Sequence, residues 1–495
     1  MITSSRSPDV IVVVMDCVRA DAFEPFHRDG SPAMPFAAKL MGESLVVSRA
    51  VSPASWTLPA TASILSGKYP WEHGIWGRSG KSYRSGVSGL ARKLSDSGYH
   101  TFALTANPIL SPDFGPMSEF DMVSWGSLSA QYLRTPGLVR PPKSWSRGQL
   151  TDNSPPSPLV PTLAKFIQRN VGVVDGPVRV LRRIMDHERE RNSSPSPWIG
   201  PSIEHLMKQI PDDRPSFTFV NLMEAHEPYV GLPLDQTSHG SWLDFVRHRQ
   251  DRSGWLSGSW TPSTDDYEFL ESLYRASILD IDRTLEGVVT VLKDCGRWDN
   301  SVFILTSDHG QTFEPGKPIY HGIGAPDSLL RIPLWIRAPE TISSGVFDSA
   351  WVSSVDLLPT IMTALGMPLG DTSGTPIQST IRAESRSPVF ALGDGLVWDA
   401  GEDLNPARTR ELDEWSLVGY AEGCRVSLDL RTSVEKVEEA PLPRATRVSG
   451  SFEVVVEPGP TILRLREIRN ELLPELGNKE RTTGVDQRLA GWGYV

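Results

Sequence analysis

The chain has 495 residues, of which 39% are hydrophobic and 22% are charged, as in an ordinary globular protein. Its length predicts more than one domain. The net charge of −11 and the isoelectric point near 5.5 exclude a general nucleic-acid binder, which would carry a basic surface. The same acidity disfavours an exposed anion-binding surface, so an anionic substrate would need a local cation such as a metal ion.

The three cysteines, Cys17, Cys295 and Cys424, lie far apart in the chain. They predict neither a disulfide framework nor a zinc–cysteine cluster, and they suit a reducing compartment. The apolar run near the N-terminus is too short to span a membrane and lacks a signal-peptide cleavage site. No later segment offers about 18 uninterrupted apolar residues. We therefore expect a cytoplasmic protein without a transmembrane segment.

Strands and helices are predicted to alternate along the N-terminal part of the chain. Runs rich in β-branched and aromatic residues suit strands buried on both faces, over 9–16, 100–107, 216–223 and 301–307. Helical spacing of apolar residues marks 89–97, 201–210 and 265–294. This alternation predicts an α/β fold with a mainly parallel sheet flanked by helices.

Two stretches interrupt this alternation. Residues 128–197 are rich in Pro, Arg and Ser and read as an insertion with surface helices, and residues 231–263 read as a long loop with a short helix over 242–249. After about residue 395 the pattern changes to antiparallel strands and one helix, predicted over 415–420, 424–430, 451–457 and 461–473. We therefore predict a main domain over 1–395, with the 128–197 insertion, and a small α+β subdomain over 396–495.

The stretch from Ala54 to Gly67 predicts a loop that leads into a short helix. Thr57 is a good N-cap, Pro59 is tolerated in the first turn, and Gly67 is a good C-terminal stop. The first turn of such a helix exposes N–H groups that suit an anionic oxygen. Taken alone, this stretch favours a capping role for Thr57 over a catalytic one.

Acidic residues and histidines gather where the predicted strands end. Because sites in open parallel sheets form at the carboxyl ends of strands, these side chains are expected to meet. Carboxylate oxygens and imidazole nitrogens together would form a site for a divalent cation. The residues concerned are Asp16, Glu224, His226, Asp308 and His309, with His321 a short loop later.

Several motifs resemble the sulfatase branch of the alkaline phosphatase superfamily. The N-terminal ones are Val14-Met-Asp-Cys-Val-Arg-Ala-Asp21 and the block Thr57-Leu-Pro-Ala-Thr-Ala-Ser-Ile-Leu-Ser-Gly67, which continues to Gly74. The later ones are Met223-Glu-Ala-His-Glu-Pro-Tyr229, Thr306-Ser-Asp-His-Gly310, the segments 330–337 and 355–360, and the closing 488–494. They come in the family's order and span residues 8–395, so the main domain resembles a sulfatase-like catalytic domain with the alkaline-phosphatase-like fold.

The resemblance implies roles for individual positions. Asp16, Asp308 and His309 match metal ligands, and Thr57 matches the nucleophile, which also faces the metal. Many sulfatases have a second acidic metal ligand at the position that Cys17 occupies here. Because this chain lacks that acid, Cys17 is either a packed thiol or a soft metal ligand. The implied cofactor is a divalent ion (Ca, Mg, Mn or Zn), with one site favoured over two.

The resemblance also implies substrate-binding positions. His226 and His321 match residues that bind the transferred group or protonate the leaving group. Candidate substrate-binding residues are Asn107, Lys317 and Arg78.

The nucleophile position departs from the usual sulfatase motif, and this departure bears on the chemistry. Sulfatases carry Cys or Ser there, followed by x-Pro-x-Arg, and convert it to formylglycine. Here the run is Thr57-Leu-Pro-Ala-Thr61, which cannot be converted and lacks the arginine. The resemblance therefore implies a two-step displacement through a Thr57 ester, as in relatives that cleave phosphate or phosphonate esters.

We expect a metal-dependent hydrolase that cleaves a phosphate, phosphonate or sulfate ester, phosphodiesters included, with the phosphorus esters favoured. A small anionic ester is the expected partner, with a glycan or a lipid headgroup as candidate carriers. Two alternatives remain: a transferase that moves a phospho-substituent to a hydroxyl acceptor, and a non-catalytic relative that binds an anion. The sequence leaves the oligomeric state open.

Overall fold

The structure is a computed structural model. It describes residues 6–23, 34–77, 82–112, 115–125, 199–211, 213–227, 229, 255, 258, 260–315, 319–383, 388–393, 415–421, 424–430, 434–439 and 459–477. The predicted insertion over 128–197, the short helix over 242–249, the strand over 451–457 and the motif over 488–494 lie outside these ranges.

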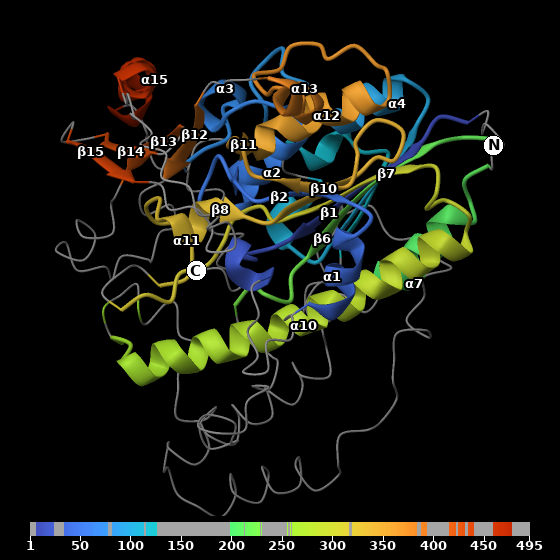
Figure 1. The fold of residues 1–495 in the computed structure, drawn as a ribbon, viewed down its shortest axis with the longest axis horizontal. Coiled ribbons are helices and arrows are strands. Elements are labelled where there is room, and N and C mark those ends of the chain that lie inside the picture. The colour runs from blue at the N-terminus through green and yellow to red at the C-terminus, as the bar shows by residue number, and fades with distance from the viewer. Residues whose placement is uncertain are drawn as a thin grey trace, which may run out of the picture.

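The centre of the fold is an eight-stranded sheet with the strand order β10-β2-β9-β7-β1-β6-β4-β5 (Figure 1). All of its pairings are parallel except those of β9, which runs antiparallel to both β2 and β7. The strands are β1 (Asp9–Met15), β2 (Leu45–Val47), β4 (His100–Thr105), β5 (Met122–Trp125), β6 (Ser216–Leu222), β7 (Ser301–Thr306), β9 (Leu334–Arg337) and β10 (Gly345–Phe347).

Strand β1 lies in the middle of this sheet and is buried on both faces. Ile11, Val13 and Met15 join one hydrophobic core, whereas Val10, Val12 and Val14 join the other. Because successive side chains of a strand point to opposite faces, an uninterrupted apolar run is what a doubly covered central strand requires. The four predicted parallel strands are confirmed as β1, β4, β6 and β7, each within two residues of its expected end.

Helices cover both faces of the sheet. On one side the core contains side chains of α1 (Pro35–Met41), α7 (Ile199–Met207) and the long α10 (Thr264–Asp294). On the other side it contains those of α2 (Thr57–Ser66), α4 (Leu90–Asp96), α12 (Leu357–Ala364) and α13 (Ile377–Arg382). Figure 1 shows α10 running along the whole length of its side. The three helices predicted over 89–97, 201–210 and 265–294 are confirmed as α4, α7 and α10.

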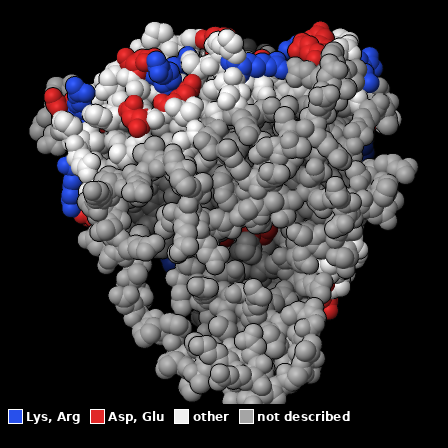
Figure 2. All heavy atoms as spheres, turned by 180° about the vertical axis from the view of Figure 1, so that it is seen from behind, with Lys and Arg blue, Asp and Glu red and all other residues white. Residues whose placement is uncertain are grey.

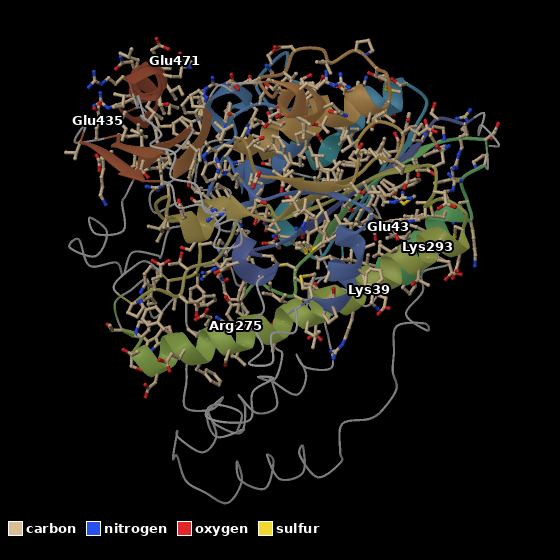
Figure 3. All side chains as sticks on the ribbon, in the orientation of Figure 1. Lys39, Glu43, Arg275, Lys293, Glu435 and Glu471 are labelled. Carbon is tan, nitrogen blue, oxygen red and sulfur yellow. The ribbon has the colours of Figure 1, made fainter. Side chains whose placement is uncertain are left out.

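A buried carboxylate on α10 fixes the start of α1. Asp282 accepts hydrogen bonds from the backbone N–H groups of Phe36 and Ala37, both at 2.8 Å. These N–H groups lie in the first turn of α1, where no intrahelical partner exists and a negative charge is favourable. Figure 3 shows Lys39 of α1 beside α10, in keeping with these two hydrogen bonds between the helices.

A separate antiparallel sheet with the order β12-β13-β14-β15 forms the C-terminal region. Its strands are β12 (Val389–Gly393), β13 (Ser416–Ala421), β14 (Cys424–Asp429) and β15 (Glu435–Glu439), and α15 (Gly459–Gly477) packs on them. Figure 3 shows Glu435 and Glu471 on the outer side of this region, where Arg466 pairs with Glu435 at 2.6 Å. The predicted α/β fold with an antiparallel C-terminal region is confirmed, and the boundary at 395/396 stays a prediction.

The remaining described elements are short. A three-stranded sheet has the order β11-β3-β8, with β3 (Ala50–Val51), β8 (Arg331–Ile332) and β11 (Val352–Ser353). The short helices are α3 (Pro70–His73), α11 (Asp327–Leu330) and the 3₁₀ turns η1 (Ala20–Phe23), η2 (Pro108–Leu110), η3 (Met117–Glu119) and η6 (Ser354–Asp356).

The described surface gives two observations that bear on partners. Figure 2 shows acidic and basic side chains interspersed over the described part of one face, rather than a single basic patch. Among the described residues, no helix has the length and apolar character that crossing a bilayer requires.

Candidate active site

The strand order brings the predicted acidic residues together at one edge of the sheet. Because β6, β1 and β7 are neighbours, the residues that follow them meet at their carboxyl ends. Asp16 follows β1, and Asp308 and His309 follow β7; all three side chains are fully buried. The His309 Nε2 atom lies 3.9 Å from Asp16 Oδ1 and 3.5 Å from Asp308 Oδ2.

Asp308 has one satisfied and one unsatisfied oxygen. Its Oδ1 accepts hydrogen bonds from the backbone N–H groups of His309 at 2.9 Å and Cys17 at 3.2 Å. Its Oδ2 is buried and accepts no hydrogen bond. Burial and the neighbouring Asp16 carboxylate raise the pKa of Asp308 to about 6. A buried carboxylate oxygen without a partner, beside a second carboxylate, is the environment that a cation would stabilise.

The tautomer of His309 also suits a cation. Its Nδ1 lies 2.8 Å from the Gly310 carbonyl oxygen, which can only accept, so Nδ1 carries the proton. The unprotonated Nε2 therefore faces Asp16 and Asp308 as a neutral ligand nitrogen. One ligand atom from each of Asp16, Asp308 and His309 lies within 4.8 Å of the others, so the three residues fit a divalent metal ion.

Asp16 is oriented by two amide groups. Its Oδ2 accepts from Asn107 Nδ2 at 2.9 Å and from Asn221 Nδ2 at 3.2 Å, while Oδ1 faces His309. The hydroxyl of Thr105 in turn donates to Asn221 Oδ1 at 3.1 Å. The amide of Asn107, a predicted substrate-binding residue, contacts the Asp16 carboxylate, and its role toward substrate stays a prediction. Asn221 lies inside strand β6, and sequence reasoning missed it because a polar residue within a strand does not by itself indicate a functional site.

Thr57 begins helix α2 at the same edge. Trp56 is the N-cap and makes no side-chain capping bond, so the expectation that Thr57 caps the helix is wrong by one position. Trp56 is extended and Thr57 is already helical, and the Thr57 hydroxyl lies beside His309, with Oγ1 3.2 Å from Nε2. The predicted end of the helix at Gly67 is confirmed, and Gly67 has a left-handed φ of 66°.

Two further histidines extend the cluster away from Asp308. The ring centroids of His309 and His321 are 4.8 Å apart, as are those of His321 and His226. The Gln311 amide donates its two N–H groups to Glu227 Oε2 at 2.9 Å and to the Tyr229 hydroxyl at 2.6 Å. Its carbonyl oxygen Oε1 therefore faces His321, 2.9 Å from Nδ1. The carbonyl end of Gln311 therefore holds the proton on His321 Nδ1 and directs Nε2 elsewhere.

Glu227, Gln311 and Tyr229 are residues of this cluster that sequence reasoning missed. Glu227 directly follows His226, and Gln311 comes two residues after His309. Their position beside predicted site residues was the available signal. Two of the predicted residues, Arg78 and Lys317, lie outside the described residues, so their placement stays a prediction.

Cys17 is buried within the same cluster. Its Sγ lies 3.2 Å from Asp16 Oδ1 and 3.7 Å from His321 Nδ1. Burial, Asp16 and Glu227 raise the pKa of the Cys17 thiol well above its ordinary value. Without a cation nearby, this side chain is therefore a neutral thiol.

Comparisons with known proteins find sulfatase-related family models and relatives. The family model "Sulfatase" matches residues 190–367, and the model "Type I phosphodiesterase / nucleotide pyrophosphatase" matches residues 10–83. An N-acetylglucosamine-6-O-sulfatase of Bacteroides thetaiotaomicron is 28% identical over 67% of this chain and 63% of its own length. Arylsulfatase K of Danio rerio is 27% identical over 39% of this chain and 38% of its own. These matches support the alkaline phosphatase-like sulfatase family.

Solved structures show the same sulfatase-like fold. A phosphonate monoester hydrolase of Silicibacter pomeroyi aligns with a TM-score of 0.56 and 17% identity over 97% of both chains. A 2-O GAG sulfatase aligns with a TM-score of 0.57 and 12% identity over 95% of this chain and 92% of its own. The named relatives are ester hydrolases. This chain spans less than two thirds of the length of curated relatives that it matches, between 24% and 63% for four of them.

Proposed function

We propose that the protein is a metal-dependent ester hydrolase that uses Thr57 as a covalent nucleophile. The observation that carries the proposal is the Thr57 hydroxyl 3.2 Å from His309 Nε2, beside the unpartnered Asp308 Oδ2. A pure anion-binding protein has no need for a buried hydroxyl at this point. The metal would be held by Asp16, Asp308 and His309, with Thr57 facing it.

The first step would be attack by Thr57 Oγ1 on phosphorus or sulfur, which forms the Thr57 ester and breaks the bond to the leaving oxygen. The ion, when bound, would supply Lewis-acid chemistry by lowering the pKa of the hydroxyl and polarising a non-bridging oxygen. Helix α2 contributes at the same point, because its first-turn N–H groups have no side-chain cap and favour developing negative charge.

The leaving oxygen would take its proton from a histidine that enters the step as an imidazolium, and the proton lost by the Thr57 hydroxyl replaces the one that the histidine gives. His321 is the better candidate, since Gln311 and Glu227 orient its ring and its centroid lies 4.8 Å from that of the ligand His309. His226 is the second candidate, on the far side of His321. A water molecule would then attack phosphorus, break its bond to Thr57 Oγ1 and release the free acid.

The phosphorus esters are the favoured substrates. A threonine ester cannot collapse to an aldehyde, which is how the formylglycine hydrate of sulfatases expels sulfate. Attack of water on phosphorus needs no such collapse. The fold is shared with a phosphonate monoester hydrolase as well as with sulfatases, which supports testing phosphonate esters first. A glycan or lipid headgroup is the proposed carrier of the ester.

The test is a substrate screen on metal-loaded protein with aryl phosphonate, phosphate monoester, phosphate diester and sulfate. Thr57→Val should lose at least about 10³-fold in kcat, and Thr57→Ser should retain part of the activity. Thr218→Val is the matched control, since Thr218 is a buried threonine of β6 whose hydroxyl makes no hydrogen bond. Full activity in Thr57→Val would refute the nucleophile, and a sulfate-only profile would refute the substrate preference.

A further inference from the structure

Strand β12 of the C-terminal sheet contacts the loop that leads into Thr57. Ala54 forms a parallel bridge with Leu392, and the Leu392 N–H donates to the Pro53 carbonyl at 2.9 Å. Figure 1 shows β12 on the side of its sheet that faces β11 and α3. The loop before the proposed nucleophile is therefore fixed by the backbone of a strand that comes more than 300 positions later in the chain.

The same strand also contacts the loop that follows His321. An added Cβ at Gly393 would lie 2.6 Å from the Gly324 carbonyl carbon and 2.6 Å from the Ala325 Cβ. Non-bonded carbon atoms prefer a separation of about 3.5–4.0 Å, so a side chain at position 393 would push this loop away. Glycine at this position allows the two backbones to meet.

The two loops also contact each other. The Gly322 N–H donates to the Ser55 carbonyl at 3.0 Å, which joins the residue after His321 to the residue two before Thr57. Both functional side chains lie beside His309: Thr57 Oγ1 is 3.2 Å from its Nε2, and the His321 ring centroid is 4.8 Å from its own. A shift of either loop along β12 would therefore change the separation between the proposed nucleophile and the proposed acid.

Hydrophobic packing on both faces of β12 holds this arrangement. Alternate side chains of the strand join two clusters, one with aromatic residues that follow helix α2 and one with residues that follow His321. The first cluster contains Phe390 and Leu392 with Tyr69 and Trp71, and the second contains Val389 and Ala391 with Ala325 and Leu330. Because packed interiors transmit small displacements, the strand and the two loops should move together.

Polar side chains of β13 and β14 hold the end of the same loop. The Tyr420 hydroxyl donates to Asp327 Oδ1 at 2.7 Å, and Arg425 Nε pairs with the same oxygen at 3.0 Å. The Arg425 guanidinium also donates to the Ala325 carbonyl. Asp327 begins helix α11, so the loop that starts at His321 is anchored to the C-terminal sheet before it enters this helix.

We propose that β12 positions His321 relative to Thr57 and that Gly393 is the positioning residue on which this depends. The inference rests on the proposed function, because it concerns the roles of these two side chains. Gly393 acts through the loop of His321 and does not itself take part in the reaction. The C-terminal sheet is thereby a part of the catalytic apparatus.

The test compares two leaving groups on the acid that the substrate screen selects. Nitrophenolate leaves without a proton, whereas unsubstituted phenolate depends on the general acid. Gly393→Ala should lower kcat/KM, which includes the step that expels the leaving group, about 100-fold for the phenyl ester and less than about tenfold for the nitrophenyl ester. A purely structural role would lower both by the same factor, and that result would overturn the proposal.

A double-mutant cycle tests whether Gly393 acts through His321. In His321→Gln, which lacks the acid, adding Gly393→Ala should change kcat/KM for the phenyl ester by less than about twofold. Losses that multiply as independent effects would overturn the proposal.

Gly419→Ala is the matched control. Gly419 lies in β13 of the same sheet, and its added Cβ would lie 2.5 Å from the side chain of Thr461 on α15. Both glycine variants should lose stability in chemical denaturation. Gly419→Ala should keep the wild-type ratio of kcat/KM for the two esters, and a ratio changed as much as in Gly393→Ala would overturn the proposal.

A milder variant serves if Gly393→Ala fails to fold. Tyr420→Phe keeps the ring beside Trp351, at a centroid distance of 4.7 Å, and removes only the hydroxyl that bonds to Asp327. It should lower kcat/KM for the phenyl ester at least about twofold more than for the nitrophenyl ester. An unchanged ratio would overturn the proposal.

The failure of this inference can be told apart from the failure of the proposed function. An inactive Thr57→Val together with a wild-type ester ratio in Gly393→Ala would keep the hydrolase and overturn the role of β12. Metal-loaded protein that hydrolyses no ester of the screen would overturn both.

Discussion

Replacing Asp308 with asparagine should stabilise the metal-free protein at neutral pH. Burial and the Asp16 charge raise the pKa of Asp308 from 3.8 to about 6. The unfolded chain ionises this carboxyl from about pH 4 upward, whereas the folded chain holds the proton until about pH 6. The metal-free wild type therefore loses stability as the pH rises through this window, by about 3 kcal/mol at about 1.4 kcal/mol per pH unit.

The asparagine variant avoids this loss and keeps the local geometry. Its side-chain oxygen can still accept from the N–H groups of His309 and Cys17, as Asp308 Oδ1 does. The free energy of unfolding of Asp308→Asn, minus that of wild type, should be near zero at pH 4 and reach about 3 kcal/mol at pH 7. Chemical denaturation of chelator-treated protein, followed by tryptophan fluorescence at several pH values, measures this difference.

A control separates this effect from the removal of any buried carboxylate. Asp9 is equally buried, but it pairs with Arg297 at 3.1 Å and accepts from Ser216. Asp9→Asn should lower stability at pH 7 by roughly 3–5 kcal/mol, because it leaves a buried guanidinium without its partner. A pH-independent difference for Asp308→Asn, or a metal-free variant less stable than wild type at pH 7, would refute the reasoning.

Metal addition should reverse the order of stability of the two proteins. An ion at 1,000 times its Kd stabilises the state that binds it by about 4.1 kcal/mol, which exceeds the difference of about 3 kcal/mol between the metal-free proteins. Wild type should gain this amount, whereas Asp308→Asn should gain little because an amide replaces the ligand carboxylate. An equal gain in both proteins would show that Asp308 does not hold the metal.

Three further outcomes are expected. Gly67→Ala should destabilise the protein by more than about 1 kcal/mol in thermal denaturation, since its φ is 66° and an added Cβ would collide with the Thr372 hydroxyl. Gly366→Ala has the same φ but no atom within 4 Å of the added Cβ, so it should cost less, and equal losses would argue against the close contact. Asn107→Ala should weaken metal binding roughly 10–100-fold in a chelator competition, because it removes the amide that donates to Asp16 at 2.9 Å, and unchanged affinity would show that this bond is dispensable. His73 is buried, and burial lowers its pKa to about 3, whereas the unfolded chain takes up this proton below about pH 6.5. Wild type should therefore lose stability as the pH falls from about 6.5 toward 3. His73→Gln should flatten this part of the profile, which a pH series of melting temperatures measures.

The sequence alone determined the layout of the fold. The uninterrupted apolar run over 10–14 predicts a strand that is buried on both faces. The helical spacing of apolar residues over 265–294 predicts one long amphipathic helix. Both signals are local, because each depends on the period of the backbone within one element. The acids and histidines at strand ends were visible for the same reason, as they interrupt apolar runs at Asp16 and Asp308.

The tertiary structure decided which atoms of these residues meet. No local signal encodes that β6, β1 and β7 are neighbours, yet this order is what brings Asp16, His226 and Asp308 to one edge. The bond from Gln311 to Glu227 joins residues 84 positions apart, and the φ of 64° at Cys17 depends on partners far away in the chain. The hydroxyl of Thr57 faces His309 only because helix α2 begins one residue earlier than its sequence predicts. Long-range pairing of strands and packing of helices, which depend on the whole chain, therefore turned a set of candidate residues into a site.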